Sequence, residues 1–211
     1  KIYIQGTFGA YSHLAALEID SNAEVIPCKT FDECFSKTSS ESGSRMLIPE
    51  SNRITGNIGI EYLIFKHRLN IYAEHFQTIE HNLLGQSDAS LKDIKDVFSH
   101  TQGLSQCSNF IKKNNLVEHI RADTAGSAES ISKKKIKSEA AIASSLSAKI
   151  YKLKILATNI ENEKSNTTRF LIMGKDIHQP DFGDKRYITS FLFKLKSKPA
   201  ALYQSLGGFA I

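Results

Sequence analysis

Five consecutive residues near the end of the chain bring together side chains that can bind an oxygen-rich ligand: Asn166-Thr167-Thr168-Arg169-Phe170. The amide, the hydroxyls and the guanidinium all donate hydrogen bonds, and the guanidinium can pair with a carboxylate. The segment leads into the apolar run 171–173, which ends at Gly174 and predicts a short buried strand. Such a strand mouth is where α/β proteins tend to bind ligands. A loop with a capping threonine is the alternative interpretation.

A glycine loop near the N-terminus is a second candidate site. Residues 2–4 predict a strand, Gly6 and Gly9 a loop, and residues 10–17 a helix. This order aims backbone N–H groups at an anion, so the loop from Thr7 to Gly9 is a candidate anion site. The spacing lacks a full dinucleotide fingerprint, and we expect no nicotinamide site. A plain tight turn remains the alternative.

A third candidate is the segment Asp123-Thr124-Ala125-Gly126-Ser127-Ala128, which caps a predicted helix with small residues. Small residues leave backbone N–H groups accessible, so Thr124 to Ser127 could also face an anion.

Other chemistries are less favoured by the residue types and spacings. The seven histidines show no metal-ligand spacing, and we expect no metal or cofactor. His100 and Cys107 could form a nucleophilic pair, but Cys107 lies on an apolar helix face, which favours a buried structural thiol. Three cysteines without close pairing predict free thiols in a reducing cytoplasm.

Composition and charge narrow the class of protein. The chain has 211 residues, of which 41% are hydrophobic and 23% charged, as is typical of one or two globular domains. No apolar stretch approaches the ~20 residues that span a bilayer, and the opening is no signal peptide, so no membrane association is expected. The net charge is +5, and the basic cluster 133–137 lacks interleaved aromatic residues. Nucleic-acid binding is therefore not expected.

Repeated strand-then-helix units predict an α/β fold with a mostly parallel sheet. The segment 70–79 alternates over ten positions and is long enough to pass from one lobe to another. A second α/β unit is then inserted before the chain returns to Thr168. Residues 180–184 are linker-like, and a strand at 187–195 and a helix from Pro199 would open a further domain. The other expected strands are 23–27, 46–49, 96–100, 117–121, 140–143 and 154–156, and the other helices start at Thr30 or span 58–65 and 102–112.

Five motifs, in order and over nearly the whole chain, resemble the prephenate dehydratase family. Each is weak alone, but together they are specific. They are Gln5-Gly6-x-x-Gly9-Ala10-Tyr11-Ser12, Ser99-His100-x-Gln102-x-x-x-Gln106-Cys107, Asp123-Thr124-Ala125-Gly126-Ser127-Ala128, Ala140-Ala141-Ile142-Ala143-Ser144 and Asn166-x-Thr168-Arg169-Phe170.

The resemblance implies a dehydratase domain at 1–176, built as two periplasmic-binding-protein-like α/β lobes with the active site in the cleft between them. Lobe one would be about 1–76 plus 157–176, and lobe two about 77–156. A linker at 177–185 would precede the start of an ACT regulatory domain at 186–211. The implied activity converts prephenate to phenylpyruvate with loss of water and carbon dioxide and without a cofactor. The family's enzymes are usually homodimers or homotetramers, and phenylalanine is their effector.

The resemblance also implies roles for individual residues. Thr168 would donate to the departing hydroxyl oxygen, while Asn52, Ser99 and Gln106 would bind other substrate oxygens. Arg169 would pair with a carboxylate or, alternatively, hold its own loop. Two readings stay open besides prephenate dehydratase: a non-catalytic sensor of prephenate or phenylalanine, and an arogenate dehydratase. The remaining implied substrate-binding residues are Asn166, Phe170, Thr7, Gly9, Ala10, Thr124, Ser127 and Glu50.

Two segments depart from the family's pattern. The family reads Pro-Ile-Glu-Asn-Ser where this chain has Pro49-Glu50-Ser51-Asn52-Arg53. Glu50 lies one residue before the position of the family's glutamate, which Ser51 occupies here. Strand alternation would therefore place the Glu50 side chain on the face opposite to that of the family's glutamate, and we favour this arrangement. A kink at Asn52 could instead bring Glu50 into the site. The family's Glu-Ser-Arg-Pro phenylalanine motif does not occur in these 211 residues, and Pro199-Ala200-Ala201-Leu202 replaces Pro-Gly-Ala-Leu. We therefore expect this chain to bind phenylalanine weakly or not at all, and we expect phenylalanine to act as an effector only in a longer chain.

Overall fold

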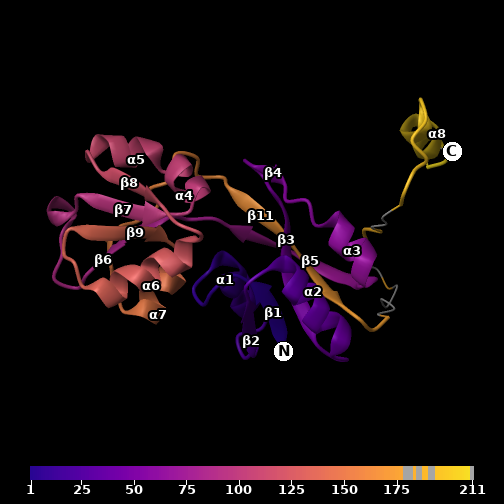
Figure 1. Ribbon diagram of the computed structural model, residues 1–211, viewed down its shortest axis with the longest axis horizontal. Coiled ribbons are helices and arrows are strands. Elements are labelled where there is room, and N and C mark those ends of the chain that lie inside the picture. The colour runs from indigo at the N-terminus through magenta and orange to yellow at the C-terminus, as the bar shows by residue number, and fades with distance from the viewer. Residues whose placement is uncertain (178–182, 184–186, 190–192, 210–211) are drawn as a thin grey trace. The chain divides into compact units, whose positions relative to one another are not determined.

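The computed structural model describes residues 1–177, 183, 187–189 and 193–209. The chain divides into two units, Lys1–His178 and Gln179–Ile211, and each is described by itself. The first unit holds two β-sheets with helices on their faces (Figure 1).

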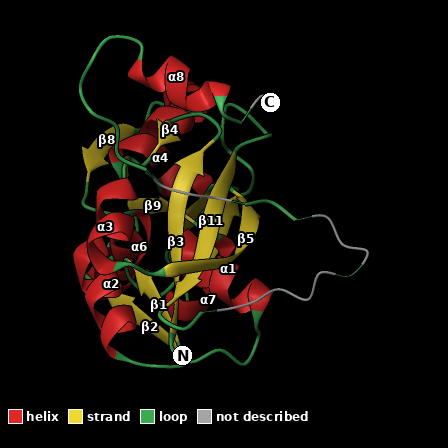
Figure 2. Ribbon diagram, turned by 90° about the vertical axis from the view of Figure 1, so that its right-hand side faces the viewer, coloured by secondary structure: helices red, strands yellow, loops and turns green. Residues whose placement is uncertain are grey.

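The first sheet has the strand order β2-β1-β3-β11-β5 (Figure 2), and the short β4 pairs with β3. β1 runs parallel to β2 and β3, whereas β11 runs antiparallel to both β3 and β5. Its strands are β1 (Ile2–Gln5), β2 (Val25–Cys28), β3 (Arg45–Asn52), β4 (Gly56–Asn57), β5 (Asn70–Thr78) and β11 (Thr167–Gly174), and its helices are α1 (Tyr11–Ile19), α2 (Phe31–Ser40) and α3 (Glu61–His67).

The second sheet has the order β10-β6-β9-β7-β8, with β7 parallel to β8 and β9, and β6 antiparallel to β9 and β10. Its strands are β6 (Asn82–Gly85), β7 (Asp96–Ser99), β8 (Val117–Ile120), β9 (Glu139–Ala143) and β10 (Lys154–Ala157), and its helices are α4 (Thr101–Gln106), α5 (Ser108–Lys113), α6 (Thr124–Lys134), α7 (Ser145–Tyr151) and the 3₁₀ turn η1 (Leu91–Asp93).

Apolar side chains bury both faces of the first sheet. Helix α1 covers one face, where Ala15 and Ala16 pack with Leu47 and Phe170. Helices α2 and α3 cover the other face, where Phe35 of α2 belongs to the same buried cluster as Leu171 and Met173 of β11. Because successive residues of a strand point to opposite faces, Phe170 and Leu171 lie in different cores. The same alternation separates Thr168 from Arg169.

The prediction of a mostly parallel sheet is wrong, because both sheets are mixed. The chain leaves the first sheet through β5, enters the second at β6, and returns as β11 between β3 and β5. These passages are direct strand connections without a crossover helix, so the strands they link need not be parallel. The strand Asn82–Gly85 and the helix Ser145–Tyr151 were not predicted, and the helix expected at 102–112 is divided at Cys107 into α4 and α5.

The second unit contains helix α8 (Ala201–Gly207). Ala200 precedes it with a φ of 59°, so Pro199 lies ahead of the helix and not in its first turn. Residues 187–189 and 193–195 of the strand expected at 187–195 are not in a strand, and residues 190–192 lie outside the described residues. Most of the expected linker, 178–182 and 184–185, also lies outside the described residues, and the ACT domain stays a prediction.

None of the helices in the described part of the chain is long and apolar enough to cross a bilayer.

Candidate active site

Thr168 lies within β11, between Asn52 of β3 and Gln77 of β5 in the strand register. The five-residue segment that carries it therefore belongs largely to the strand itself, and only Asn166 precedes the strand. Directly opposed residues of neighbouring strands share a face, so Asn52, Thr168 and Gln77 all point to the face covered by α1.

Four predicted site residues form one hydrogen-bonded group, which we call the amide cluster: Asn52, Gln106, Asn166 and Thr168. Asn52 Nδ2 donates to Thr168 Oγ1 at 2.8 Å and to Asn166 Oδ1 at 2.8 Å. Asn166 Nδ2 donates to Gln106 Oε1 at 3.0 Å. Because Asn52 belongs to the first sheet and Gln106 to a helix of the second, the cluster joins the two sheets.

The backbone beside Asn52 fixes the direction of these hydrogen bonds. Asn52 Oδ1 accepts from the N–H groups of Ile54 (3.0 Å) and Thr55 (3.1 Å). Backbone N–H groups can only donate, so the amide nitrogen of Asn52 must face Thr168. Thr168 Oγ1 is therefore an acceptor in this bond, and its own proton has no acceptor among the described residues. Thr168 is 8% exposed, so this hydroxyl is largely shielded from solvent and can donate a hydrogen bond to a ligand.

Two residues that were not predicted to belong to the site extend the amide cluster. His81 Nε2 lies 2.8 Å from Gln106 Oε1, and His81 Nδ1 lies 2.8 Å from Tyr11 Oη. Tyr11 Oη is also 2.8 Å from the carbonyl oxygen of Glu80. Burial lowers the pKa of His81 and raises that of Tyr11 well above its usual range. His81 could not be identified from the sequence, because the strand that follows it was not predicted.

Arg169 points to the opposite face of β11 and is held by two carboxylates. Its Nε donates to Glu74 Oε2 at 2.7 Å, and its Nη1 donates to Glu50 Oε2 at 3.2 Å. These bonds, chiefly the one to Glu74, raise the pKa of the guanidinium. Of the two roles expected for Arg169, the geometry supports the structural one, because its charge is already balanced within the protein.

Glu50 occupies a β-bulge, which breaks the alternation that we assumed for it. Arg169 pairs with Ser51 and Phe170 with Pro49, so Glu50 is an extra residue in β3. A bulge turns two successive side chains toward one side. Ser51 Oγ accordingly donates to Glu50 Oε2 at 2.6 Å. The alternation that we assumed for residues 50 and 51 is therefore wrong, because both side chains lie on the side of Arg169. The kink lies at Glu50 and not at Asn52, and the carboxylate faces Arg169, away from Thr168, so it is not brought into the site as the alternative arrangement required.

Two other predicted residues have their side chains committed elsewhere. Ser99 is fully buried, and its Oγ donates to the Ile142 carbonyl at 2.7 Å. Phe170 is 2% exposed and packs in the core under α1. The predicted contacts of these two side chains with substrate are therefore not supported, because neither side chain reaches solvent.

The glycine loop of the first sheet forms hydrogen bonds with residues next to the second sheet. The Gly9 N–H donates to His13 Nδ1 at 3.0 Å and the Ala10 N–H to the Thr7 carbonyl at 3.1 Å, so these two donors are occupied within the protein. The Gly9 carbonyl accepts from Ser144 Oγ (2.6 Å) and Ser147 Oγ (2.9 Å) of the second sheet's region. Gly9 has a φ of +90°, and an added Cβ would lie 2.6 Å from Ser147 Oγ, so this approach requires glycine.

The Asp123 cap is likewise engaged within the protein. Asp123 Oδ1 accepts from the Gly126 N–H at 2.6 Å and from Thr7 Oγ1 at 3.3 Å. Ser127 is buried, and its Oγ donates to the Asp123 carbonyl at 2.8 Å. Thr124 is half-buried in the first turn of α6. The cap joins the two sheets, as the glycine loop does, and its occupied Gly126 N–H does not fit the anion site that we expected.

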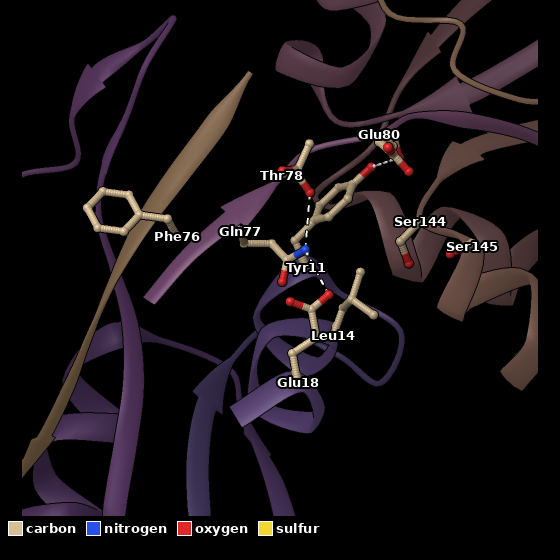
Figure 3. A pocket seen from close by; sticks show the side chains of 9 residues that line it. All are labelled: Tyr11, Leu14, Glu18, Phe76, Gln77, Thr78, Glu80, Ser144 and Ser145. Atoms are coloured by element: carbon tan, nitrogen blue, oxygen red, sulfur yellow. Dashed lines mark hydrogen bonds between the residues drawn. The ribbon is translucent and has the colours of Figure 1, made fainter. Parts of the chain in front are cut away.

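Figure 3 shows a polar pocket of about 300 Å³ that Tyr11 helps to line. Tyr11 connects this pocket with the amide cluster, because its side chain lines the pocket while its hydroxyl contacts His81. Thr168 does not line this pocket, so the pocket is separate from the predicted catalytic hydroxyl. Its lining residues are Tyr11, Leu14, Glu18, Phe76, Gln77, Thr78, Glu80, Ser144 and Ser145.

Cys107 is buried, as expected, and burial raises the pKa of its thiol. His100 Nδ1 accepts from the Gln102 N–H and caps α4. The two residues therefore form no nucleophilic pair. Within the described residues, no group of three or more His, Cys, Asp or Glu side chains could hold a metal ion.

Residues 2–178 match the family model described as "Prephenate dehydratase". The chain is 37% identical to arogenate dehydratase 2 of Petunia hybrida over 212 residues, covering 100% of this chain and 54% of that protein. It is 33% identical to a bifunctional N-acyl-homoserine lactone acylase/prephenate dehydratase of Komagataeibacter europaeus, covering 99% of this chain and 75% of that protein. The chain thus spans about half the length of several plant relatives that it matches.

A solved prephenate dehydratase of Arthrobacter aurescens, in complex with L-Phe, superposes with a TM-score of 0.85. The two chains are 21% identical, and the match covers 100% of this chain and 72% of the other. At this identity the likeness establishes the fold.

Proposed function

Because this chain belongs to the prephenate dehydratase family, we propose that it catalyses the decarboxylating dehydration of prephenate to phenylpyruvate. The observation that carries the proposal is the hydrogen bond from Asn52 Nδ2 to Thr168 Oγ1, which leaves the threonine proton free for a substrate oxygen.

The chemistry needs little more than orientation and a proton. The bond between the ring and its carboxyl group breaks, its electrons complete the aromatic ring, and the ring hydroxyl leaves. Thr168 donates a hydrogen bond, and finally a proton, to that oxygen, which departs as water. The charge left on Thr168 Oγ1 is stabilised by the N–H of Asn52, and solvent returns the proton after product release.

Gln106 supplies a second donor. Its Oε1 is occupied by Asn166 and His81, so its Nε2 group, which has no partner among the described residues, is free to donate. Asn52 and Asn166 hold the two donors in fixed directions, which lowers the entropic cost of reaching the transition state. Arg169 is not assigned to the substrate, because two glutamates already balance its charge.

Arogenate is a second candidate substrate, favoured by the plant relative whose printed name is arogenate dehydratase 2 and which matches the whole chain. Arogenate carries an amino group where prephenate has a keto group, and the same bond changes would yield phenylalanine. The reacting ring is the same in both molecules, so the amide cluster serves either substrate.

The assembled protein and its setting are further proposals. Phenylalanine as the effector of a longer chain is supported by the L-Phe in the name of the Arthrobacter structure. A homodimer or homotetramer is proposed from the family membership alone. A reducing compartment such as the cytoplasm is supported by Cys28, Cys34 and Cys107, which are all free thiols.

The deciding experiment incubates the chain separately with prephenate and with arogenate, and follows phenylpyruvate by ultraviolet absorbance and phenylalanine by chromatography. Turnover of prephenate is the expected result. Turnover of arogenate alone would transfer the proposal to that substrate. Tight binding of prephenate without product would favour the non-catalytic sensor and contradict the enzymatic role.

A further inference from the structure

The six side chains from Thr168 to Tyr11 form one continuous chain of hydrogen bonds, and its directions can be worked out from one end. The backbone N–H groups of Ile54 and Thr55 fix the Asn52 amide. Asn52 Nδ2 then makes Asn166 Oδ1 an acceptor, so Asn166 Nδ2 faces Gln106 and requires its oxygen there.

The same reasoning fixes the proton on His81. Gln106 Oε1 has no proton, so the 2.8 Å contact with His81 requires the imidazole to carry its proton on Nε2. Burial lowers the pKa of His81 and favours the neutral ring. In the neutral ring Nδ1 is then bare, and it shares the single Tyr11 hydroxyl proton with the Glu80 carbonyl, because each of these two acceptors lies 2.8 Å from Tyr11 Oη.

The backbone of His81 is clamped in this position. Its N–H donates to Glu161 Oε2 at 2.9 Å, and its carbonyl accepts from the Ile160 N–H at 3.0 Å. The residue is 3% exposed, so water does not compete for its ring. His81 lies between β5 and β6, where the chain passes from one sheet to the other. The sequence predicts no role for this residue.

We propose that His81 is a positioning residue for the dehydration, because its Nε2–H group holds the Gln106 amide so that Gln106 Nε2 faces the substrate as a donor. This inference rests on the proposed function. Without that bond, Gln106 keeps only its link to Asn166 and can rotate or invert its amide. An inverted amide would present an acceptor to the anionic substrate where a donor is needed.

Two substitutions of similar polarity separate this role from a purely structural one. In His81→Gln the side-chain amide reaches the position of Nε2 and can still donate to Gln106. In His81→Asn the shorter amide reaches only the position of Nδ1, beside Tyr11. Gln106 then lacks the hydrogen bond from residue 81 and keeps only the one from Asn166. Tyr11 is accommodated in His81→Gln, because the Glu80 carbonyl already lies 2.8 Å from its hydroxyl.

In the full chain we expect kcat of His81→Asn to fall about 10- to 100-fold with KM changed less than about threefold, since a misplaced donor costs mainly transition-state stabilisation. His81→Gln should keep kcat within about fivefold of the parent. Equal losses in the two variants, or a fully active His81→Asn with a normal melting temperature, would overturn the proposal.

A substrate-free measurement separates this inference from the proposed function. The ¹⁵N shifts of the neutral His81 ring should report a protonated Nε2 and a bare Nδ1, and should do so even if the chain converts neither prephenate nor arogenate. A ring protonated on Nδ1 alone would overturn the inference, whatever the activity. Inactivity of the parent chain toward both substrates, with the expected ring shifts, would count against the proposed function and remove the role in dehydration.

Discussion

Two neighbouring residues of β11, Thr168 and Arg169, face opposite sides of the sheet and lie in opposite kinds of surroundings. Thr168 accepts a hydrogen bond from the neutral amide of Asn52, and its own proton has no acceptor among the described residues. Arg169 is charged, and its guanidinium is bonded to Glu50 and Glu74. The charged residue is thus the one whose charge is already balanced within the protein.

The comparison shows why charge alone is a poor guide to this site. A guanidinium next to a threonine suggests a carboxylate-binding pair, but strand alternation places the two groups on different faces. What distinguishes the Thr168 face is a set of amides whose directions are fixed by backbone donors, and which leave two donors free. Such fixed donors stabilise a departing oxygen without having to reorient during the reaction.

Removing the Thr168 hydroxyl should have the largest effect on activity. In Thr168→Val the shape of the side chain is kept, and kcat should fall by about 10²–10³, as for the loss of a transition-state donor. Thr167→Val is the matched control, because Thr167 is the preceding residue of the same strand and faces the other side. Steady-state kinetics with prephenate measure the difference. Equal activity of both variants would mean that Thr168 is only structural.

Removing the Arg169 charge should affect stability more than turnover. Arg169→Met leaves Glu50 and Glu74 facing one another, and we expect a loss of about 1–2 kcal/mol in the free energy of unfolding, since the pair is partly exposed. Urea denaturation measures the loss. Adding Glu74→Gln to Arg169→Met should recover part of it, because one carboxylate is then neutral. A rise of 100-fold in KM with normal stability would instead identify Arg169 as a substrate ligand.

The bulge at Glu50 leads to a smaller expected effect. Glu50→Gln should reduce kcat less than about fivefold, because the carboxylate bonds to Ser51 and Arg169 on the face away from Thr168. Glu74→Gln, which removes the other partner of Arg169, should behave alike and is the control. If Glu50→Gln abolishes turnover while Glu74→Gln does not, and the pair Ser51→Glu with Arg53→Ser also harms it, Glu50 is a working carboxylate.

The sequence allowed much of this site to be predicted, but by resemblance and not by local pattern. Asn52, Gln106, Asn166 and Thr168 were expected together, and the structure brings them within hydrogen-bonding distance. His81 was missed because nothing near it in the chain shows that it meets Gln106, a contact created by the passage of the chain between two sheets.

The bulge at Glu50 and the antiparallel insertion of β11 were missed for a related reason. Periodicity reports which residues lie in a strand, but not which strand lies beside it. Strand register is decided by tertiary packing, and here a single extra residue in β3 reversed the expected direction of a carboxylate.

The smallest effect that we expect is on the pH dependence of the unfolding free energy. Burial lowers the pKa of His81 below its usual value of about 6.5. Below pH 6.5 the unfolded chain therefore binds a proton that the folded chain resists, and stability falls as the pH drops toward the lowered value. In His81→Gln this contribution is absent, so its unfolding free energy should decline less steeply between pH 6.5 and 5. Thr167→Val retains His81 and changes no titratable group, so it should keep the parent's slope. Denaturation at several pH values tests this, and identical slopes in the parent and His81→Gln would show that the imidazole is not held neutral by the fold.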